Sequence, residues 1–178
     1  MKKTLKMQWN LQIVWKYSKN GGKMEKNKLY ETIFKRKSIR NYDLTPLDQN
    51  TLTEIKNHLN TLEFLYEDIK TEFKIIGTDD VKRRIMKKSP HYIAVFSENK
   101  EGYLTNAGFM LQQMDLYLSA KGIGTCWQGI PQPKKEVLKS SDLEFVILIA
   151  FGKAKEPLHR KGVAEFKRKS LKEISDVH

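Results

Sequence analysis

The stretch Gly102-Tyr-Leu-Thr-Asn-Ala-Gly-Phe-Met-Leu-Gln-Gln-Met-Asp-Leu-Tyr-Leu-Ser-Ala-Lys-Gly-Ile-Gly-Thr-Cys-Trp-Gln-Gly129 sets the organisation of this chain. Between Tyr103 and Ala120, apolar side chains recur at helical spacing and cover most of the circumference, which predicts a helix buried on most sides. Polar residues interrupt it at four positions, namely Asn106, Gln112, Gln113 and Asp115. They favour a core or subunit-interface helix over a membrane span.

A glycine stop and a short strand follow this helix. Gly122 stands where a residue in the left-handed conformation commonly ends a helix. Residues 123–127 have the pattern of a strand that enters a turn at Gln128-Gly129. The whole unit can present backbone N–H groups to a flat ligand.

Length and charge limit the possible functions. The 178 residues suffice for one domain with a hydrophobic core. Of the net charge of +12, six lysines lie in residues 1–23, which contain no acidic residue, so residues 24–178 carry only +6. That charge fits an anionic small ligand, and the basic stripe with interleaved aromatics that marks nucleic-acid binding is missing. One cysteine, Cys126, excludes an internal disulfide framework and is compatible with the cytoplasmic location that we expect.

Residues 1–23 differ from the rest of the chain. Met1-Lys-Lys resembles the start of a secretory signal, but the segment from Met7 to Trp15 is interrupted by Gln and Asn and lacks a cleavage site of small residues. We therefore expect a flexible, basic N-terminal tail at residues 1–23 and a single domain at 24–178. Met24 is a candidate alternative start, because a coherent pattern begins directly after it.

Helical and strand patterns alternate from there on. Helices are expected at 27–35, after Thr45-Pro46, at 103–120 and at 134–139, together with a basic helix from Thr78 to about Lys88; strands are expected at 72–77, 89–97, 123–127 and 143–152. The predicted fold class is α+β, a sandwich with a central mixed or antiparallel sheet and helices on both faces. An apolar central helix also suggests burial against a second subunit, and hence a homodimer.

Two short cationic clusters lie near opposite ends of the body. They are Arg36-Lys-Ser-Ile-Arg40 and Phe166-Lys-Arg-Lys-Ser170. Arginine forks bind phosphate oxygens in pairs, and a serine hydroxyl adds a neutral donor. Each cluster alone is weak evidence, because basic segments of this length are usually part of a solvated surface. The glycine-bracketed turn from Gly122 to Gly129 is the third candidate feature.

No nucleophile and base accompany these features. The four histidines are scattered, and none has metal-ligand spacing with a carboxylate or Cys126, so no metal site is expected. No glycine-rich nucleotide-binding signature is found either. An enzyme of this composition would take its chemistry from a bound cofactor.

Together, the three features resemble the FMN-dependent nitroreductase family. Arg36-Lys-Ser-Ile-Arg40 is similar to the family's RRSIR opening, and Leu118-Ser-Ala-Lys-Gly-Ile-Gly-Thr-Cys-Trp127 to the end of its central helix and the GLGTCW segment that follows. Residues 145–152 resemble its last core strand, and Phe166-Lys-Arg-Lys-Ser-Leu171 its basic RKPLEE ending. The resemblance covers about residues 25–175.

This resemblance implies a nitroreductase-like sandwich, a homodimer with the long helix at its interface, and FMN bound between the subunits. It also implies ping-pong transfer of reducing equivalents from NAD(P)H to a nitroaromatic, a quinone or a similar acceptor, with the flavin rather than a catalytic side chain carrying the chemistry. The implied cofactor-binding residues are Arg36, Lys37, Ser38 and Arg40 at the phosphate and pyrimidine edge, Lys167 and Arg168 at the phosphate, and Trp127, Gln128 and Gly129 near flavin N5. No nucleic-acid or membrane partner is expected.

The match has a gap, and it leaves two alternatives. The family's Ser-x-x-Asn-x-Gln-Pro-Trp segment has no counterpart, because Asn60-Thr-Leu-Glu-Phe-Leu-Tyr66 occupies that region, which indicates a compact, divergent subgroup. A protein that binds or stores FMN with little turnover is therefore one alternative. A basic nucleic-acid-binding protein is the other, and residues 1–23 are its main argument.

Overall fold

A computed structural model gives the fold and describes residues 23–82, 87–166 and 169–174. The helices are α1 (Lys23–Lys35), α2 (Gln49–Leu59), α3 (Tyr103–Ala120), α4 (Lys135–Leu138) and α5 (Leu171–Ile174). The strands are β1 (Thr71–Gly77), β2 (Val81–Lys82), β3 (His91–Ser97), β4 (Gly124–Gln128), β5 (Gln132–Pro133) and β6 (Glu144–Gly152). Two 3-10 turns, η2 (Thr78–Asp80) and η3 (Val163–Phe166), complete the order. The structure confirms the helix predicted at 103–120 and places the four predicted strands within a few residues of their expected bounds.

A four-stranded sheet in the order β1-β3-β6-β4 forms the centre of the domain, and all its neighbouring strands are antiparallel. All seven residues of β3 are buried, because β1 and β6 flank the strand and both faces of the sheet are covered. The prediction that this strand is internal is therefore confirmed. A separate two-stranded sheet joins β2 to β5.

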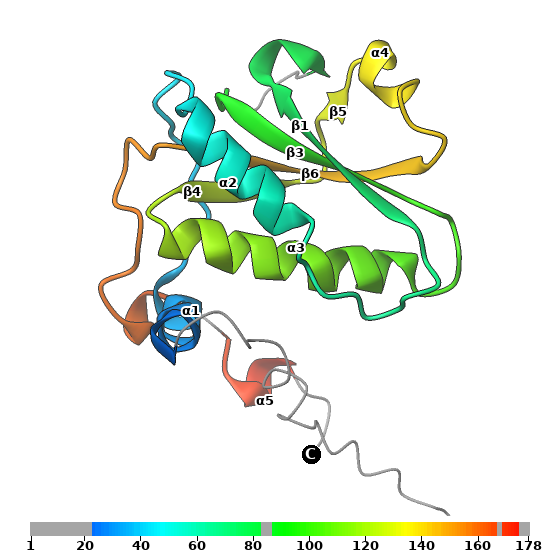
Figure 1. Cartoon of the computed structure of the whole chain (residues 1–178). Coiled ribbons are helices and arrows are strands. Elements are labelled where there is room, and N and C mark those ends of the chain that lie inside the picture. The colour runs from blue at the N-terminus through cyan, green and yellow to red at the C-terminus, as the bar shows by residue number, and fades with distance from the viewer. Residues whose placement is uncertain (1–22, 83–86, 167–168, 175–178) are drawn as a thin grey trace, which may run out of the picture.

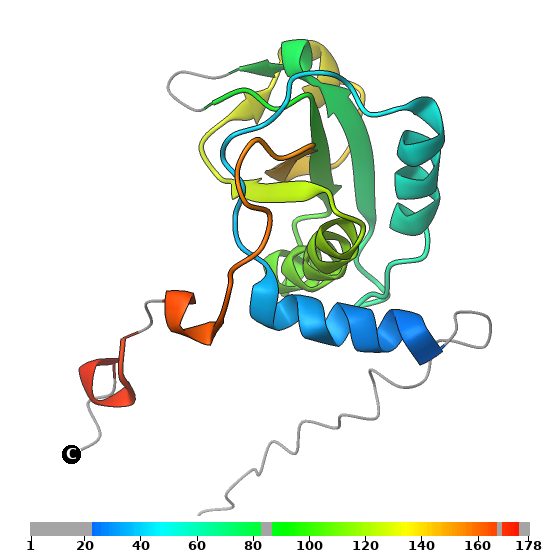
Figure 2. The ribbon, with the colours of Figure 1, turned by 90° about the vertical axis from the view of Figure 1, so that its left-hand side faces the viewer.

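Two apolar layers cover the sheet. On one face α2 and α3 pack against β3 and β6 through a cluster that includes Ile55, Met114 and Phe151. On the other face the chain around Ile39 and Tyr42 packs with α4. Figures 1 and 2 show α1 crossing α3 on the side away from the sheet. Helices thus lie on both faces, as predicted.

The central helix is buried largely within one chain. The side chains of Met110, Leu111, Met114 and Leu118 are at most 1% exposed, because α1, α2 and the sheet surround them. The apolar circumference of α3 was the reason to expect a second subunit against it. That reason does not hold, since the same chain provides the cover.

The prediction of a basic helix from Thr78 to about Lys88 is wrong for residues 78–82, which form a 3-10 turn and a short strand instead. A carboxylate oxygen of Asp80 accepts the Gly77 N–H at 3.0 Å and closes a single 3-10 turn. The chain then continues as β2, where Val81 pairs with Pro133. Pairing with a distant strand therefore overrides the local capping signal. Residues 83–86 lie outside the described residues.

His91 gives the fold a dependence on pH. Its Nε2 accepts the Leu47 N–H at 2.9 Å, and burial lowers the pKa of the ring below its ordinary value of 6.5. As the pH falls, the unfolded chain takes up this proton first, so the stabilisation is complete above about pH 7 and is lost as the pH falls from 6.5 toward the folded-state pKa.

We expect His91→Gln, which keeps an acceptor near Leu47 but does not titrate, to lose less unfolding free energy than the wild type on acidification. Urea unfolding at about pH 7.5 and about pH 5.5 measures the difference. Equal losses in the two proteins would assign the acid sensitivity to other groups.

Candidate functional site

The Arg36-Lys-Ser-Ile-Arg40 segment lies beside β4. The Ile39 N–H donates to the Thr125 carbonyl at 2.8 Å, and Arg36 forms an isolated bridge with His159. Ile39 packs directly on Gly124, where an added Cβ would stand 2.9 Å from the Ile39 side chain. The second glycine of the Gly122-Ile-Gly124 pattern is therefore needed for this close approach, which brings the first cationic cluster against the glycine turn.

We expect Gly124→Ala to lower the free energy of unfolding by about 1–3 kcal/mol, because the new methyl group overpacks a rigid contact. Gly108 in α3 supplies the control. No other side chain or segment lies within 4 Å of its added Cβ, so Gly108→Ala should stabilise the protein by up to about 1 kcal/mol. Chemical denaturation of both variants tests the pair. Recovery of stability in Gly124→Ala/Ile39→Ala would identify the overpacked contact, and no recovery would exclude it.

Asp115 of α3 connects two parts of this site, the Arg36 segment and β4. Its carboxylate, fully buried, forms an ion pair with Arg36 (Nε to Oδ2, 2.7 Å). The Trp127 indole N–H donates to the same Oδ2 at 3.1 Å, and the Thr125 hydroxyl donates to Oδ1. One side chain therefore holds the first cationic cluster and β4 together. In the sequence alone, Asp115 stands out only as a polar interruption of an apolar helix.

Three buried side-chain atoms of the Arg36 segment and β4 have no hydrogen-bond partner among the described residues, namely Nε and Nη2 of Arg36 and Oε1 of Gln128. The Arg36 contact with Asp115 is an ion pair rather than an aligned hydrogen bond, so the guanidinium keeps free donors. Buried polar groups are nearly always paired, so the unpaired donors of Arg36 and the unpaired acceptor of Gln128 are each a group that a polar ligand would complete.

The second cationic cluster begins close to the first. Lys167 and Arg168 lie outside the described residues, but the residues before them do not. The Arg160 N–H donates to the Lys35 carbonyl at 2.8 Å, and its guanidinium donates to the Arg36 carbonyl. The same guanidinium stacks over the Phe166 ring, 4.3 Å from its centroid. The chain thus arrives beside Arg36 one residue before Lys167.

The remaining predicted residues of the first cluster surround Cys126 and Glu156. Lys37 and Ser38 are half-buried, and Arg40 is exposed. The Glu156 carboxylate accepts the backbone N–H groups of Arg40 at 2.6 Å and Asn41 at 2.9 Å, which lowers its pKa. These bonds fix the backbone of the cationic segment.

Cys126 lies on the inner side of this segment. Burial raises the pKa of its thiol, while Arg40 and a hydrogen bond from Ser38 oppose that shift without cancelling it. The group therefore stays a thiol near neutral pH. On this account Cys126 is a packing residue rather than a nucleophile.

The turn after β4 offers further donors. Gln128 is buried at the end of the strand, whereas Gly129 is exposed. Neither Gly129 nor Ile130 donates its N–H to another described backbone group. Trp127 is anchored to Asp115, so the position of this turn is fixed relative to Arg36.

Residues 60–66, where the family's Ser-x-x-Asn-x-Gln-Pro-Trp segment is missing, are held by two amides of α3. The Asn106 Oδ1 accepts the N–H groups of Leu65 at 2.9 Å and Tyr66 at 3.0 Å. The Gln113 side chain bonds both the N–H and the carbonyl of Glu63. The loop therefore has a defined conformation without the family's motif.

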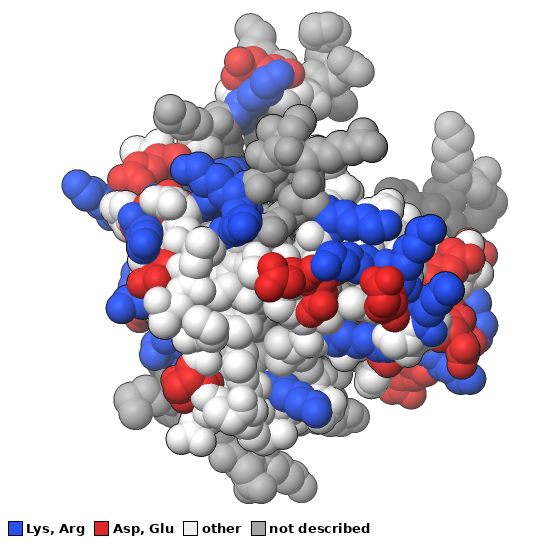
Figure 3. All heavy atoms as spheres, turned by 90° about the horizontal axis from the view of Figure 1, so that it is seen from above, with Lys and Arg blue, Asp and Glu red and all other residues white. Residues whose placement is uncertain are grey.

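Charges are mixed on the face seen in Figure 3, where Lys and Arg alternate with Asp and Glu around a broad uncharged area. This face shows no continuous basic stripe. Among the described residues, no helix is long and apolar enough to cross a bilayer, and no three His, Cys, Asp or Glu side chains gather as metal ligands.

Comparison with known proteins shows where this arrangement belongs. The model of the family described as "Putative TM nitroreductase" matches residues 28–178. The chain belongs to the nitroreductase family. The match covers α2 to α5, all strands and most of α1, so it includes both cationic clusters and the glycine turn. No protein of curated function matches the sequence significantly.

Solved structures share this nitroreductase fold. A nitroreductase family protein from Clostridium novyi NT is 23% identical, with 72% of this chain and 86% of that chain covered and a TM-score of 0.57. A protein from Parabacteroides distasonis ATCC 8503, described as "Putative NADH dehydrogenase/NAD(P)H nitroreductase", is 17% identical over 85% and 99% of the two chains, with a TM-score of 0.63. A nitroreductase with bound FMN from Desulfitobacterium hafniense DCB-2 is 12% identical over 81% and 99%, with a TM-score of 0.58. The α+β nitroreductase sandwich predicted from the sequence is thereby confirmed.

Proposed function

We propose that this nitroreductase family member is an FMN-dependent oxidoreductase. It passes reducing equivalents from NAD(P)H to a nitroaromatic, a quinone or a similar small acceptor in a ping-pong sequence. Support comes from the family, from a relative of this fold with bound FMN and from another whose description includes NAD(P)H. The observation that carries the proposal is the buried Arg36 guanidinium, which keeps an unpaired donor while Asp115 fixes it beside the glycine turn.

The residues present fit the phosphate end of FMN. Arg36, Ser38 and Arg40 offer charged and neutral donors on one segment, and Arg160 and Phe166 bring the chain to that segment just before Lys167 and Arg168. Two cationic segments that converge on a dianion explain why both ends of the body are basic. Lys37 adds charge nearby.

The other end of the site suits the flavin ring. The Trp127-Gln128-Gly129 turn supplies fixed backbone N–H groups for N5, and the unpaired Gln128 oxygen can accept an N–H of the ring. FMN, when bound, supplies the acceptor and donor of hydride. The contribution of the chain is to orient the ring, to exclude water from one side of it and to stabilise negative charge with the nearby cations.

We also propose a homodimer in the cytoplasm. The exposed apolar side chains that support a dimer gather on α1, where Tyr30, Ile33 and Phe34 are 64%, 49% and 43% exposed, and Leu104 at the start of α3 is 60% exposed. A patch of this kind on a helix commonly marks a protein interface. Neither a nucleic acid nor a membrane forms part of the proposal.

The proposed function is tested by flavin binding and by anaerobic reduction. Purified protein loaded with FMN should show the visible flavin absorbance, and NADH or NADPH should bleach it in the absence of oxygen. Recovery of the absorbance when a quinone or nitroaromatic is then added completes the reaction. A protein that binds FMN but is not bleached would be a storage protein, and one that binds no FMN would refute both assignments.

A further inference from the structure

Arg36 and Asp115 form a charge pair that is largely removed from water. The Asp115 carboxylate is fully buried, and the Arg36 side chain, whose Nε lies 2.7 Å from Oδ2, is 20% exposed. Water screens charges weakly in such a place, so each member of the pair acts on its surroundings more strongly than a surface charge does. The pair belongs to the proposed flavin site, where the Arg36 guanidinium keeps an unpaired Nη2.

Cys126 shows that the two charges oppose each other inside this site. Burial raises the pKa of the Cys126 thiol, and the positive charge of Arg36 lowers that pKa while the negative charge of Asp115 raises it. Both charges are therefore felt beyond their own ion pair. Any further group bound beside Arg36 meets the sum of the two rather than a full positive charge.

We propose that Asp115 is a positioning residue that lowers the reduction potential of bound FMN by offsetting the charge of Arg36. This inference rests on the proposed function, because it concerns the cofactor named there. Transfer of a hydride from NAD(P)H adds two electrons and one proton and leaves NAD(P)+, so the reduced ring carries one more negative charge than the oxidised ring. A cation beside the ring favours the reduced form.

The ionised carboxylate leaves the Arg36–Asp115 pair without net charge. Arg36 can then hold and orient the cofactor with a smaller bias toward its reduced form. The lower potential favours the second half of the ping-pong sequence, in which the acceptor takes the electrons. Asp115 thus acts on the cofactor through Arg36 and touches neither the cofactor nor the substrates in this account.

Asp115→Asn separates the charge of this side chain from its contacts. The amide oxygen can take the place of Oδ2, which faces Arg36 and accepts the Trp127 N–H at 3.1 Å. The amide nitrogen then takes the place of Oδ1 and donates to the Thr125 hydroxyl, because a hydroxyl can accept as well as donate. All three partners are retained while one negative charge is lost.

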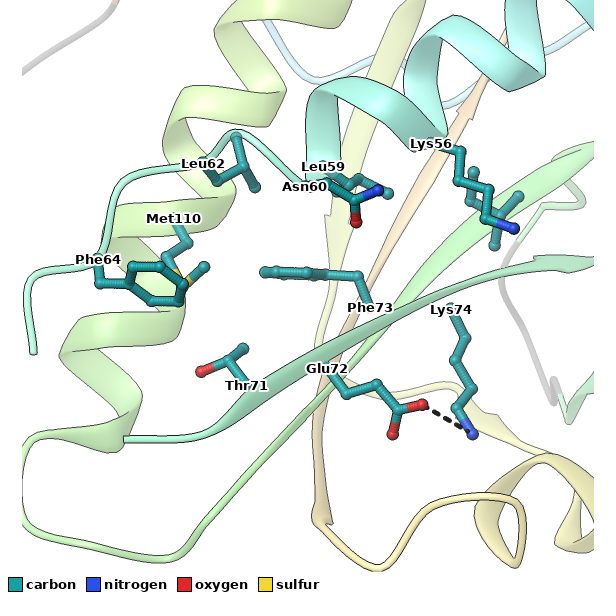
Figure 4. A pocket seen from close by; sticks show the side chains of 11 residues that line it. Lys56, Leu59, Asn60, Leu62, Phe64, Thr71, Glu72, Phe73, Lys74 and Met110 are labelled. Carbon is teal, nitrogen blue, oxygen red and sulfur yellow. Dashed lines mark ion pairs between the residues drawn. The ribbon is translucent and has the colours of Figure 1, made fainter. Parts of the chain in front are cut away.

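Glu72→Gln is the matched control. Glu72 also pairs with a cation, since its Oε1 lies 3.3 Å from Nζ of Lys74, and its replacement removes one negative charge in the same way (Figure 4). Glu72 is 42% exposed and lies on β1, at the edge of the sheet opposite to β4. Three strand spacings, about 14 Å, separate these edges, so solvent screens the charge of Glu72 from the site.

Potentiometric titration of the FMN-loaded proteins with a reference dye measures the midpoint potential. We expect Asp115→Asn to favour the reduced form roughly tenfold, which for two electrons raises the potential by about 30 mV. The ratio of the Kd values for oxidised and reduced FMN should change by the same factor. Glu72→Gln should keep the wild-type potential. All variants are made in the full chain, because residues 1–22 of the expected flexible tail lie outside the described residues and must be the same in each.

The double variant Arg36→Gln/Asp115→Asn tests the offset directly. It also serves where the single variant does not fold, because it leaves no uncompensated charge in the buried pair. If Asp115 offsets Arg36, removal of both charges leaves the ratio of the two Kd values within about twofold of the wild type, even though both affinities fall. If the charge of Arg36 acts unopposed, its loss favours the oxidised form roughly tenfold.

The outcomes separate this inference from the proposed function. A wild-type or lower potential in Asp115→Asn, or a shift equal to that of Glu72→Gln, would overturn the inference and leave the proposed function standing. A lower potential in the double variant would do the same. Wild-type protein that binds no FMN would refute the proposed function, and the inference with it.

Discussion

Replacement of Asp115 by alanine is expected to lower the free energy of unfolding by about 3–5 kcal/mol. The carboxylate is fully buried and receives Arg36, Thr125 and Trp127 together. Its removal leaves a partly buried cation and two polar hydrogens without their acceptor, and this loss exceeds that of an ordinary surface ion pair. The effect should also reach the cofactor, because Arg36 and the turn after β4 lose their common anchor.

Urea unfolding of Asp115→Ala, beside Gln112→Ala as the control, measures this effect. Gln112 is exposed on the same helix, so its replacement should change the unfolding free energy by less than about 0.5 kcal/mol. A double-mutant cycle with Arg36→Ala should show strong coupling, since either single change already breaks the pair. Additive effects would mean that the two charges do not stabilise each other.

The second large effect is expected in FMN affinity. Arg168→Ala should weaken FMN binding roughly ten- to a hundredfold, because one charge-assisted hydrogen bond to phosphate contributes about 1.5–3 kcal/mol. Arg36→Lys should have a similar effect, since lysine keeps the charge against Asp115 but loses the second nitrogen of the fork. Alanine is less suitable at position 36, because it would also leave Asp115 buried and unpaired.

FMN titration of both single variants and the double variant tests whether Arg36 and Arg168 bind one phosphate. Partners on one ligand should couple, whereas independent sites should add. Lys139→Ala is the control, because this exposed lysine follows α4, far along the chain from both clusters. Wild-type affinity in Arg168→Ala would remove Arg168 from the site. Wild-type affinity in both single variants would remove the main support for flavin binding.

Much of the fold is predictable from the sequence because its elements have strong local signals. The α3 pattern runs without a break from Tyr103 to Ala120, and Gly122 ends it with a φ of 86°. β3 and β6 are apolar on both faces, as interior strands must be. The failure at 78–82 has the opposite cause, because the pairing of β2 with β5 is a long-range contact that no local signal reveals.

The candidate site could be located from the sequence but not assembled from it. The motifs around Arg36 and Trp127 marked two of its parts, but nothing local showed that Asp115 holds both. The only sequence signal for Asp115 is that a carboxylate stands in an apolar helix. Its role follows only from the positions of Arg36, Thr125 and Trp127, which the fold brings to it. Lys167 and Arg168 remain predictions, supported by the position of Phe166.

The polar side chains of α3 also limit how this protein can change in length. Asn106 and Gln113 hold the 60–66 loop, and Asp115 holds the Arg36 segment and β4. At about 100° and 1.5 Å per residue, Asn106 and Asp115 project from nearly opposite sides of the helix, about 13–14 Å apart along its axis. One inserted or deleted residue between them would turn Asp115 by about 100° and release its partners. Insertions and deletions in α3 are therefore compatible with both sets of contacts only outside the interval between Asn106 and Asp115, whose length is fixed by the two sides of the helix that must be satisfied.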